Sequence, residues 1–451
     1  MRLLLIHVSK NWHGRVYAEY PLGAGLIATI ARSLGHWAQV HDMAVDESPI
    51  DEIIKKYRPD VVGLSFLSTS SRSAYRTIGS LRAVFHGPVI AGGIHSSLFP
   101  EEVLAAGADV VVIGEGENKV APLLNALSLT CDARQNALSL IPGLAFRDDE
   151  GTLKRTEADP ISVILDDLPI VDRTVFDLSR YTHHSLITSR GCPYRCKFCC
   201  SWGPGGRKGR MASPSRVLKE LQELALLHDA ETVYWADDMF FFNKRDRLAF
   251  CKELSESGLD VHWIAQLRAD NIDLELAEAM RAAGCVKVCL GTEAGSDVLL
   301  RSIDKDITVE KIRNGVKTAV AAGLKVKTWW IVGLPGSSNL NDHLSAIDLI
   351  EDTRPHEVAV HNFIPLPGTQ YWTDAERFGI HLPGPEVLED IYYYGLSDAL
   401  RFDYISKEQI QTVLAEYDVR LTAMGYLPTD RAPVDAKYVY TTPLQKTTFR
   451  V

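Results

Sequence analysis

The sequence has no long apolar run, no excess of positive charge, no solenoid-type repeat and no low-complexity segment. No stretch approaches the about 18 consecutive apolar residues of a membrane span, so no such span is expected. The formal net charge of −10 argues against the broad basic surface typical of nucleic-acid-binding proteins. The chain has 451 residues, 46% of them hydrophobic and 24% charged. This is the balance of an ordinary globular protein with room for two or three domains.

The cysteine pattern does not suggest a disulfide framework, and we do not expect a cleaved leader. Residues 1–7 start with a short apolar run, but no small-residue cleavage site follows, so we expect a buried strand there. Four of the eight cysteines lie within residues 192–200, whereas disulfide-forming cysteines are usually spread along small secreted chains. Clustered cysteines in a large chain indicate a metal site, and we expect a reducing, cytoplasmic location. The other four are expected to be bystanders: Cys131, Cys251, Cys285 and Cys289.

Short apolar strands alternate with helical stretches over the first 125 residues. This alternation is typical of an α/β fold with a doubly wound parallel sheet, in which ligands bind at the carboxyl ends of the strands. Residues 126–180 are expected to be a linker with a hairpin near residues 148–151. The expected strands are 3–8, 38–41, 61–66, 88–91 and 110–113.

A second series of six strand–helix units begins near residue 184. Six such units fit a partial TIM-type barrel of parallel strands, with its chemistry at the C-terminal face. We expect the barrel to occupy residues 181–375 and a mostly helical extension to occupy residues 376–451. The expected barrel strands are 185–188, 232–236, 261–266, 286–291, 325–332 and 357–363.

The cysteine cluster has the spacing C-x3-C-x2-C, formed by Cys192, Cys196 and Cys199 directly after the first barrel strand. Thiolates are soft ligands that suit zinc or an iron–sulfur cluster. Cys200 is adjacent to Cys199, and neighbouring residues rarely converge on one metal ion, so we expect it to be a bystander. Three ligands on one loop leave a coordination position open, as a catalytic metal requires. A structural zinc site is the alternative.

This spacing, with Phe198 before the last cysteine, resembles the radical S-adenosylmethionine (radical SAM) superfamily, and residues 180–380 follow the family's motif order. The resemblance implies that the three cysteines hold a 4Fe–4S cluster and that SAM chelates its open iron. One electron from the reduced cluster then yields a 5′-deoxyadenosyl radical. The resemblance also implies an electron donor such as flavodoxin or ferredoxin.

The resemblance implies a SAM site made by residues at successive strand ends. Asp237 or Asp238 is expected to face the methionine ammonium, and Arg268 its carboxylate, because an arginine can bind a carboxylate through two hydrogen bonds. Glu293 is expected to accept hydrogen bonds from the ribose. Phe198 and Gly333 are expected near the adenine.

Residues 1–125 resemble the cobalamin (B12)-binding domain that precedes many radical SAM barrels. Glycines at the strand ends would give a corrin room to approach the backbone. No Asp-x-His-x-x-Gly motif offers a histidine to cobalt, and His95 is expected to be a pocket residue more than a ligand. A domain that keeps the fold without the cofactor is the alternative. The expected cobalamin contacts are Ser68, Thr69, Gly92, Gly93, His95, Gly114, Glu115 and Gly116.

The leading hypothesis is therefore an enzyme of natural-product or antibiotic biosynthesis that methylates a carbon of a small-molecule substrate with the help of cobalamin. A radical dehydration or rearrangement without cobalamin, for example of an aminoglycoside diol, is the alternative within the same family. Modification of RNA or of a peptide is a different class, and the acidic balance argues against it. We expect neither a nucleic-acid nor a membrane partner.

Overall fold

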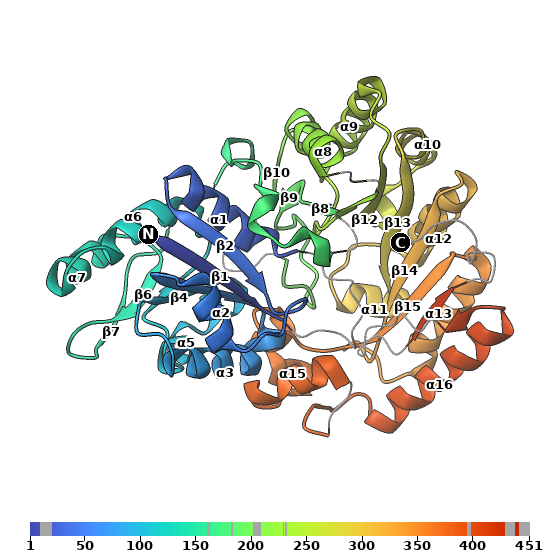
Figure 1. Cartoon of the computed structure of the whole chain (residues 1–451). Helices are drawn as coiled ribbons and strands as arrows, with labels where there is room; N and C mark the ends of the chain where they lie inside the picture. The colour runs from blue at the N-terminus through green and yellow to red at the C-terminus, as the bar shows by residue number, and fades with distance from the viewer. Residues whose placement is uncertain are drawn as a thin grey trace. The chain divides into compact units, whose positions relative to one another are not determined.

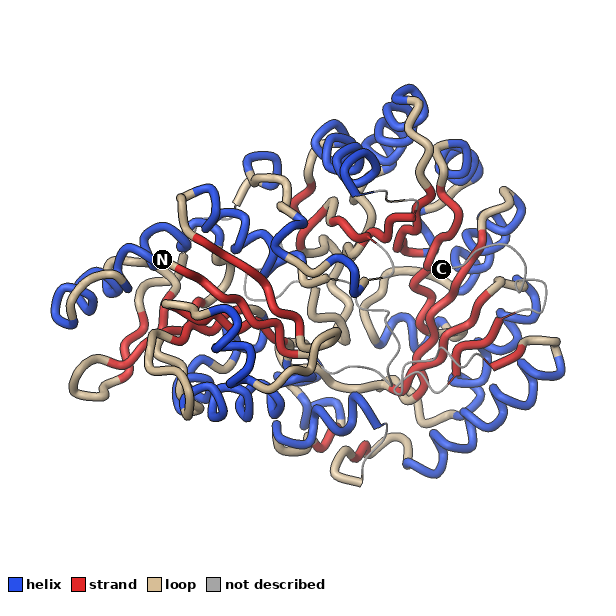
Figure 2. Tube along the Cα trace, in the orientation of Figure 1, coloured by secondary structure: helices blue, strands red, loops and turns tan. Residues whose placement is uncertain are grey.

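The computed structural model describes residues 1–9, 20–159, 163–181, 184–201, 209–228, 230, 232–394, 398–428 and 438–441. These residues fall into two compact units. Those up to residue 181 form unit 1, and those from residue 184 form unit 2. Each unit is built around one large sheet with helices packed against it (Figures 1 and 2).

The sheet of unit 1 has the strand order β2-β1-β3-β4-β5-β6-β7. The first five strands along the chain pair in parallel and the last two are antiparallel. The doubly wound parallel sheet predicted from the sequence is confirmed. The strands are β1 (Arg2–Val8), β2 (Trp37–Asp42), β3 (Val61–Phe66), β4 (Val89–Gly92), β5 (Val110–Val112), β6 (Leu144–Arg147) and β7 (Leu153–Arg155).

Helices cover both faces of this sheet (Figure 1). On one face, Ile53, Ile78 and Val103 of α2, α3 and α5 are buried in one core cluster with the apolar strand residues. Helix α1 packs near β1, β2 and α6. The helices are α1 (Leu22–Ser33), α2 (Ile50–Tyr57), α3 (Ser71–Arg82), α4 (Ile94–Leu98), α5 (Pro100–Ala105), α6 (Val120–Leu127) and α7 (Cys131–Ser139), with 3-10 turns η1 (Ser68–Ser70), η2 (Glu117–Lys119), η3 (Leu165–Asp167), η4 (Arg173–Val175) and η5 (Leu178–Arg180).

Much of the segment that the sequence assigns to a linker has regular structure in unit 1. Strands β6 and β7 form the expected hairpin, with Gly151 at φ +80° in its turn. The hairpin continues the sheet because β6 pairs with β5. Residues 126–155 therefore extend the N-terminal fold.

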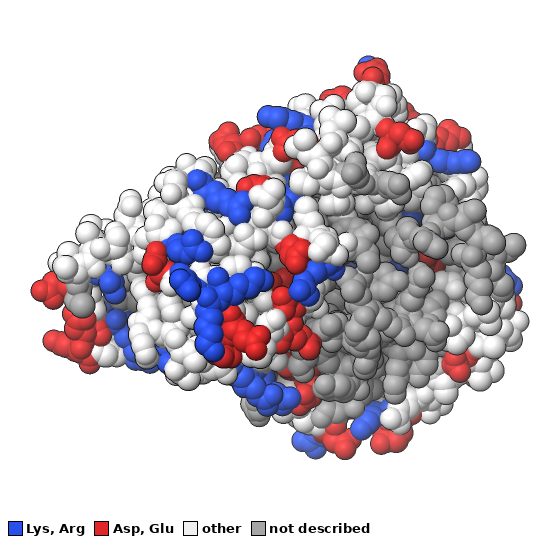
Figure 3. All heavy atoms as spheres, viewed as in Figure 1, with Lys and Arg blue, Asp and Glu red and all other residues white. Residues whose placement is uncertain are grey.

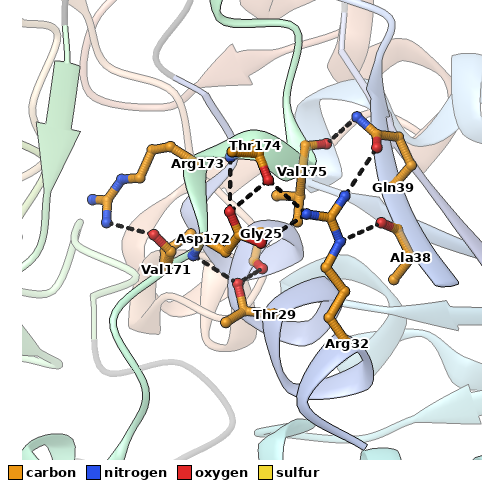
Figure 4. Close-up of polar contacts among 10 residues, drawn as sticks. All are labelled: Gly25, Thr29, Arg32, Ala38, Gln39, Val171, Asp172, Arg173, Thr174 and Val175. Carbon is orange, nitrogen blue, oxygen red and sulfur yellow. Dashed lines mark hydrogen bonds and ion pairs between the residues drawn. The ribbon is translucent and has the colours of Figure 1, made fainter. Parts of the chain in front are cut away.

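The next stretch, residues 171–181, is tied to α1 and β2 by polar contacts (Figure 4). The guanidinium of Arg32 donates to Asp172 Oδ2 at 2.7 Å, to Thr174 Oγ1 and to the carbonyl of Ala38. The Asp172 amide donates to Thr29 Oγ1 at 3.0 Å. Tyr181, the last described residue of unit 1, is also held to the sheet, because its hydroxyl donates a hydrogen bond to Asp42 at the end of β2.

Unit 2 contains six parallel strands in chain order, followed at one edge by two short antiparallel strands. The six-stranded parallel sheet agrees with the prediction. The two added strands were not predicted, because the sequence there suggests only irregular structure. The strands are β8 (His184–Leu186), β11 (Thr232–Trp235), β12 (His262–Arg268), β13 (Cys285–Glu293), β14 (Lys325–Val332), β15 (Glu357–Asn362), β18 (Leu427–Pro428) and β19 (Tyr438–Thr441).

The strands of unit 2 present one face to the helices and the other inward. On β14, Val326, Trp330 and Val332 are fully buried, whereas the alternate residues Lys327 and Trp329 are only half-buried. We call the face that carries Lys327 the inner face. The helices are α8 (Pro214–His228), α9 (Lys244–Ser257), α10 (Leu274–Ala282), α11 (Asp297–Ser302), α12 (Val309–Ala321), α13 (Leu340–Thr353), α14 (Gln370–Thr373), α15 (Pro385–Tyr394) and α16 (Lys407–Ala423).

None of the described helices is long and apolar enough to cross a membrane. On the face drawn in Figure 3, acidic and basic side chains are interspersed over the described surface. The face shows no broad field of positive charge, which accords with the net charge of −10.

Candidate active site

The cysteine loop follows β8 and the two-residue strand β9 (Ser189–Arg190), which pairs with β10 (Arg210–Met211). Gly191 turns the chain out of β9 with φ +70°, a conformation that glycine adopts without strain. Cys196 is buried, Cys192 and Cys199 are half-buried, and all three are free thiols. The loop is anchored to unit 2, since the Lys197 amide donates to the Ile303 carbonyl at 3.0 Å.

The three thiols lie close enough to affect one another's ionisation. Burial raises the pKa of all three, and of Cys196 to about 11, while the charge of Cys199 further raises the pKa of the other two. Lys305 and Arg268 act in the opposite direction on the pKa of Cys196. Cations beside a thiol favour the thiolate, which is the form that binds metal.

The chemistry of this donor set fits an iron–sulfur cluster. Among the residues that the structure describes, no three His, Cys, Asp or Glu side chains are placed to share a single metal ion. A cluster does not require such convergence, because each cysteine ligand binds a different iron atom. Cys199 Sγ also lies 2.9 Å from the Ser201 hydroxyl, a contact that stabilises its thiolate. Cys200 is half-buried, and burial raises its pKa to about 11.

The two aspartates that follow β11 differ in their surroundings. Asp237 is buried and accepts hydrogen bonds from the Thr188 amide, the Thr188 hydroxyl and the Ser189 amide. Burial raises its pKa to about 7. Asp238 is exposed, and its charge raises the pKa of Cys192, Cys199 and Cys200. Asp237 thus fixes the start of the cysteine loop, and Asp238 is the carboxylate beside the cysteines that is open to a ligand.

Arg268 ends β12 beneath the cysteine loop. Its guanidinium pairs with Asp270 at 3.0 Å, donates to the Lys305 carbonyl at 2.6 Å and lies 3.8 Å from the ring centre of Tyr194. Its third nitrogen, Nη1, is buried and has no hydrogen-bond partner among the described residues. A buried donor without a partner is costly, so this atom fits a ligand carboxylate.

Glu293 ends β13 with φ +66°, and its Oε1 accepts a hydrogen bond from Lys305 Nζ at 2.9 Å. Both side chains are almost fully buried. Gly291 leaves room for this pair, because a Cβ there would lie 2.8 Å from Glu293 Oε1. Lys305 was not predicted, since it follows helix α11 and belongs to no strand end.

Two further predicted SAM contacts, Phe198 and Gly333, are not part of the group formed by Arg268, Lys305 and Glu293. Phe198 is half-buried on the cysteine loop. Gly333 has φ +86°, and a Cβ added there would lie 3.0 Å from Ile410 Cδ1 of α16. Its carbonyl accepts a hydrogen bond from the Tyr404 hydroxyl. The structure therefore groups Arg268, Lys305 and Glu293 around Cys196, whereas Gly333 meets α16.

In unit 1, the strand order reverses between β1 and β3, which is where ligands of such sheets bind. Ser68 and Thr69 lie in the 3-10 turn directly after β3, and both are buried. Gly92 ends β4, and Gly93 follows it with φ +93°. Its backbone passes within reach of β3, because a Cβ at Gly93 would lie 3.3 Å from the Phe66 carbonyl.

Among the predicted cobalamin contacts after β5, Gly114 has open space beside its backbone. It has φ +76°, and a Cβ there would meet nothing within 4 Å, whereas one at Gly116 would meet Ile27 at 3.2 Å. Glu115 is held from within the unit, since its Oε2 accepts from the Val163 amide at 3.2 Å. The open space at Gly114 is the feature here that fits a ligand lying close to the backbone.

His95 is buried, with both ring nitrogens in contact with neighbours. Its Nδ1 lies 3.0 Å from Ser68 Oγ, and its Nε2 lies 2.7 Å from the Tyr75 hydroxyl. Burial lowers its pKa to about 4, so the ring is neutral at physiological pH. Its contacts link η1, α3 and α4 and occupy both ring nitrogens.

Comparison with known proteins agrees with this division of the chain. Residues 15–124 match the family model of the B12 binding domain, and residues 186–347 match that of the radical SAM superfamily. The chain is 28% identical to an uncharacterized methyltransferase, PH0819, from Pyrococcus horikoshii, covering 87% of this chain and 86% of the relative. It is also 28% identical to the anaerobic magnesium-protoporphyrin IX monomethyl ester cyclase of Rubrivivax gelatinosus, covering 74% and 63% respectively.

The fold is also similar to a solved structure. The radical SAM methyltransferase TsrM from Kitasatospora setae, with cobalamin and a 4Fe–4S cluster bound, superimposes with a TM-score of 0.72 at 18% identity. The match covers 98% of this chain and 84% of TsrM. At this identity the likeness concerns the fold alone.

Proposed function

Because this chain is a radical SAM enzyme with a B12-binding domain, and so uses a 4Fe–4S cluster, SAM and cobalamin, we propose that it transfers a methyl group to a carbon atom of a small-molecule substrate. The observation that carries this proposal is the presence of both domains in one chain, at residues 15–124 and 186–347. The name methyltransferase given to the relative from Pyrococcus horikoshii supports it. An electron donor such as flavodoxin or ferredoxin would reduce the cluster.

When bound, these cofactors supply one-electron cleavage of SAM, hydrogen abstraction by the 5′-deoxyadenosyl group and a methyl group for the resulting carbon radical. In the proposed site, Cys192, Cys196 and Cys199 hold the cluster. The cations Arg268 and Lys305 favour the thiolate of Cys196. These charges also offset part of the negative charge that thiolates bring into a buried site.

The residues at the strand ends orient SAM in this proposal. Arg268 Nη1 donates to the methionine carboxylate, since it is a buried donor that lacks a described partner. Asp238 accepts from the methionine ammonium, because Asp237 already holds the cysteine loop. Glu293, kept in place by Lys305, accepts from the ribose hydroxyls.

In unit 1, the proposed cobalamin site lies at the carboxyl ends of β3, β4 and β5. Ser68 and Thr69 line one end of it, Gly92 and Gly93 the middle, and Gly114 the other end. The neutral His95 supports Ser68 through its 3.0 Å contact. In this reading the glycines admit the corrin close to the backbone, and Glu115 and Gly116 shape the adjoining turn.

Anaerobic reconstitution with iron, sulfide and hydroxocobalamin tests this proposal. The absorption spectrum should report one cluster and about one cobalamin per chain. With a reductant and SAM, the protein should form both S-adenosylhomocysteine and 5′-deoxyadenosine. A protein that forms 5′-deoxyadenosine but takes up no cobalamin and forms no S-adenosylhomocysteine would belong to the dehydration or rearrangement class instead.

A further inference from the structure

Three lysines come together around one carboxylate on the inner face of unit 2. On β13, β14 and β15, Lys287, Lys325 and Lys327 all act on a single carboxylate, Glu357. Glu357 pairs with Lys287 at 2.5 Å. Among the residues that the structure describes, no carboxylate pairs with Lys327.

Lys327 lies opposite Glu357 in the sheet and also contacts the aromatic ring of Trp329. Its Nζ lies 4.0 Å from the ring centre of Trp329, and the Trp329 ring stacks on His361 with centroids 5.1 Å apart and planes 25° apart. A cation over an indole ring is attracted to it, but this attraction replaces only part of the lost hydration. The placement leaves the ammonium able to bind an anion.

His361 supplies a second, independent sign of a ligand. Its Nε2 is buried and has no hydrogen-bond partner among the described residues. Burial, together with the nearby charge of Lys327, lowers its pKa to about 4, so the ring is neutral and can donate or accept one hydrogen bond at Nε2. Buried polar atoms normally have partners, and a ligand oxygen beside the Trp329 ring would provide one.

These groups lie on the strands that also end in the proposed SAM site. In the parallel register, Trp329 is opposite Gly291, two residues before Glu293, and Lys327 is opposite Cys289. The register shifts between Gly291 and Glu293, but a Cβ at Gly291 would lie 2.8 Å from Glu293 Oε1, so the Glu293 side chain lies over Gly291 on this face. Lys327 and Trp329 therefore follow Glu293 inward along the same face, where a substrate of the proposed reaction would have to reach SAM.

We propose that this inner face is the substrate subsite of the enzyme, and that the substrate is a small organic anion, with Lys327 binding its carboxylate or phosphate group and Trp329 packing against its carbon skeleton. This inference rests on the proposed function, since it assigns the substrate class of that same site. It goes further in requiring a negative charge on the substrate.

Binding of simple probes to the reconstituted protein tests the inference without turnover. The probes are phenyl phosphate and phenylacetate, with 2-phenylethanol as the neutral analogue, and affinity is measured by NMR saturation-transfer titration. The wild type should bind at least one of the two anions about tenfold more tightly than the alcohol, and the tighter anion identifies the group recognised.

Lys327→Met should weaken binding of that anion about tenfold or more and leave binding of the alcohol within about threefold. Lys327→Arg should restore most of the affinity. Lys317→Met, which removes an exposed lysine of α12, is the matched control and should leave all affinities unchanged.

Equal binding of anions and alcohol to the wild type, no binding of either anion, or undiminished anion binding by Lys327→Met would each overturn the subsite. These results are separate from the test of the proposed function. A protein that binds the anions but holds no cobalamin would contradict the methylation alone, and one that holds all cofactors but ignores the anions would contradict the subsite alone.

Discussion

Lys305 Nζ lies 2.9 Å from Glu293 Oε1, and the two side chains are 5% and 11% exposed. The pair lies where β13 ends, next to the guanidinium of Arg268, which donates to the Lys305 carbonyl. One lysine thus neutralises a buried carboxylate with its side chain and satisfies a buried arginine with its backbone. This arrangement connects the stability of the strand end to the proposed SAM site.

Lys305→Met should therefore destabilise the cluster-free protein strongly. The substitution leaves Glu293 buried without its cation, and breaking a buried pair in this way costs about 3–5 kcal/mol. The midpoint of thermal unfolding should be several degrees lower in Lys305→Met than in the wild type. Lys311→Met removes an exposed lysine of α12 and should leave the transition unchanged. Equal transitions for the two variants would show that the ion pair contributes nothing.

Arg268→Leu should weaken SAM binding about 10- to 100-fold, which corresponds to loss of about 1.5–3 kcal/mol for hydrogen bonds to a charged group. Isothermal titration of SAM into the reconstituted protein measures this change. Arg245→Leu, at a side chain that is 86% exposed on α9, is the matched control. Unchanged SAM affinity in Arg268→Leu would remove this arginine from the site.

The cysteines offer a test in which the control is the neighbouring residue. Cys192→Ala, Cys196→Ala and Cys199→Ala should each abolish the stable cluster, seen as loss of bound iron and of the visible absorption after reconstitution. Cys200→Ala should retain both, because only three thiolates are needed when SAM occupies the fourth iron. Loss of the cluster in Cys200→Ala and its retention in Cys199→Ala would reverse the assignment.

For cobalamin, the structure favours Gly92 as the position to change. A Cβ at Gly92 would make only an ordinary 3.8 Å contact with Val112, whereas Gly93 has positive φ and Gly116 meets Ile27. Gly92→Leu should therefore fold and yet lose cobalamin, because the new side chain takes up space beside the backbone. Gly79→Ala, on an open helix position, should keep both fold and cofactor. Full cobalamin uptake by Gly92→Leu would argue against a corrin at these strand ends.

The connecting stretch of unit 1 should loosen at low pH. Burial raises the pKa of Asp172, but hydrogen bonds from Thr174 and Arg32 outweigh it, so the pKa lies below the ordinary value of 3.8. A lowered carboxyl pKa stabilises the fold above the ordinary value, and the contribution disappears as the pH falls through the folded-state pKa. The protection factor of the Asp172 amide against hydrogen exchange, which corrects for the intrinsic pH dependence, should fall there, and in Arg32→Ala it should be low already at pH 7.

The sequence predicted the parallel strands well because their cores are continuous apolar runs, such as 61–66, that end in glycine or polar residues. The cysteine motif was predicted equally well, because its spacing lies within eight consecutive residues, 192–199. The Arg32–Asp172 pair joins residues 140 positions apart, and Lys305 reaches Glu293 across a helix. Such contacts depend on tertiary packing. For the same reason, the adjacent Asp237 and Asp238 could not be told apart until the hydrogen bonds of Asp237 were known.

Lys327 gives a last prediction that concerns stability rather than binding. Burial lowers the pKa of Lys327, assisted by the charge of Lys287 and opposed by Cys289 and Glu357. A lysine whose pKa falls on folding destabilises the native state at every pH where it is charged in the unfolded chain. Lys327→Met should therefore raise the melting temperature of the substrate-free protein at pH 7, and the gain should shrink as the pH rises toward the ordinary value of 10.5. A buried charge that lowers the stability of the free protein is expected where that charge binds a ligand. A lower melting temperature in Lys327→Met would instead show that the ammonium is satisfied within the fold.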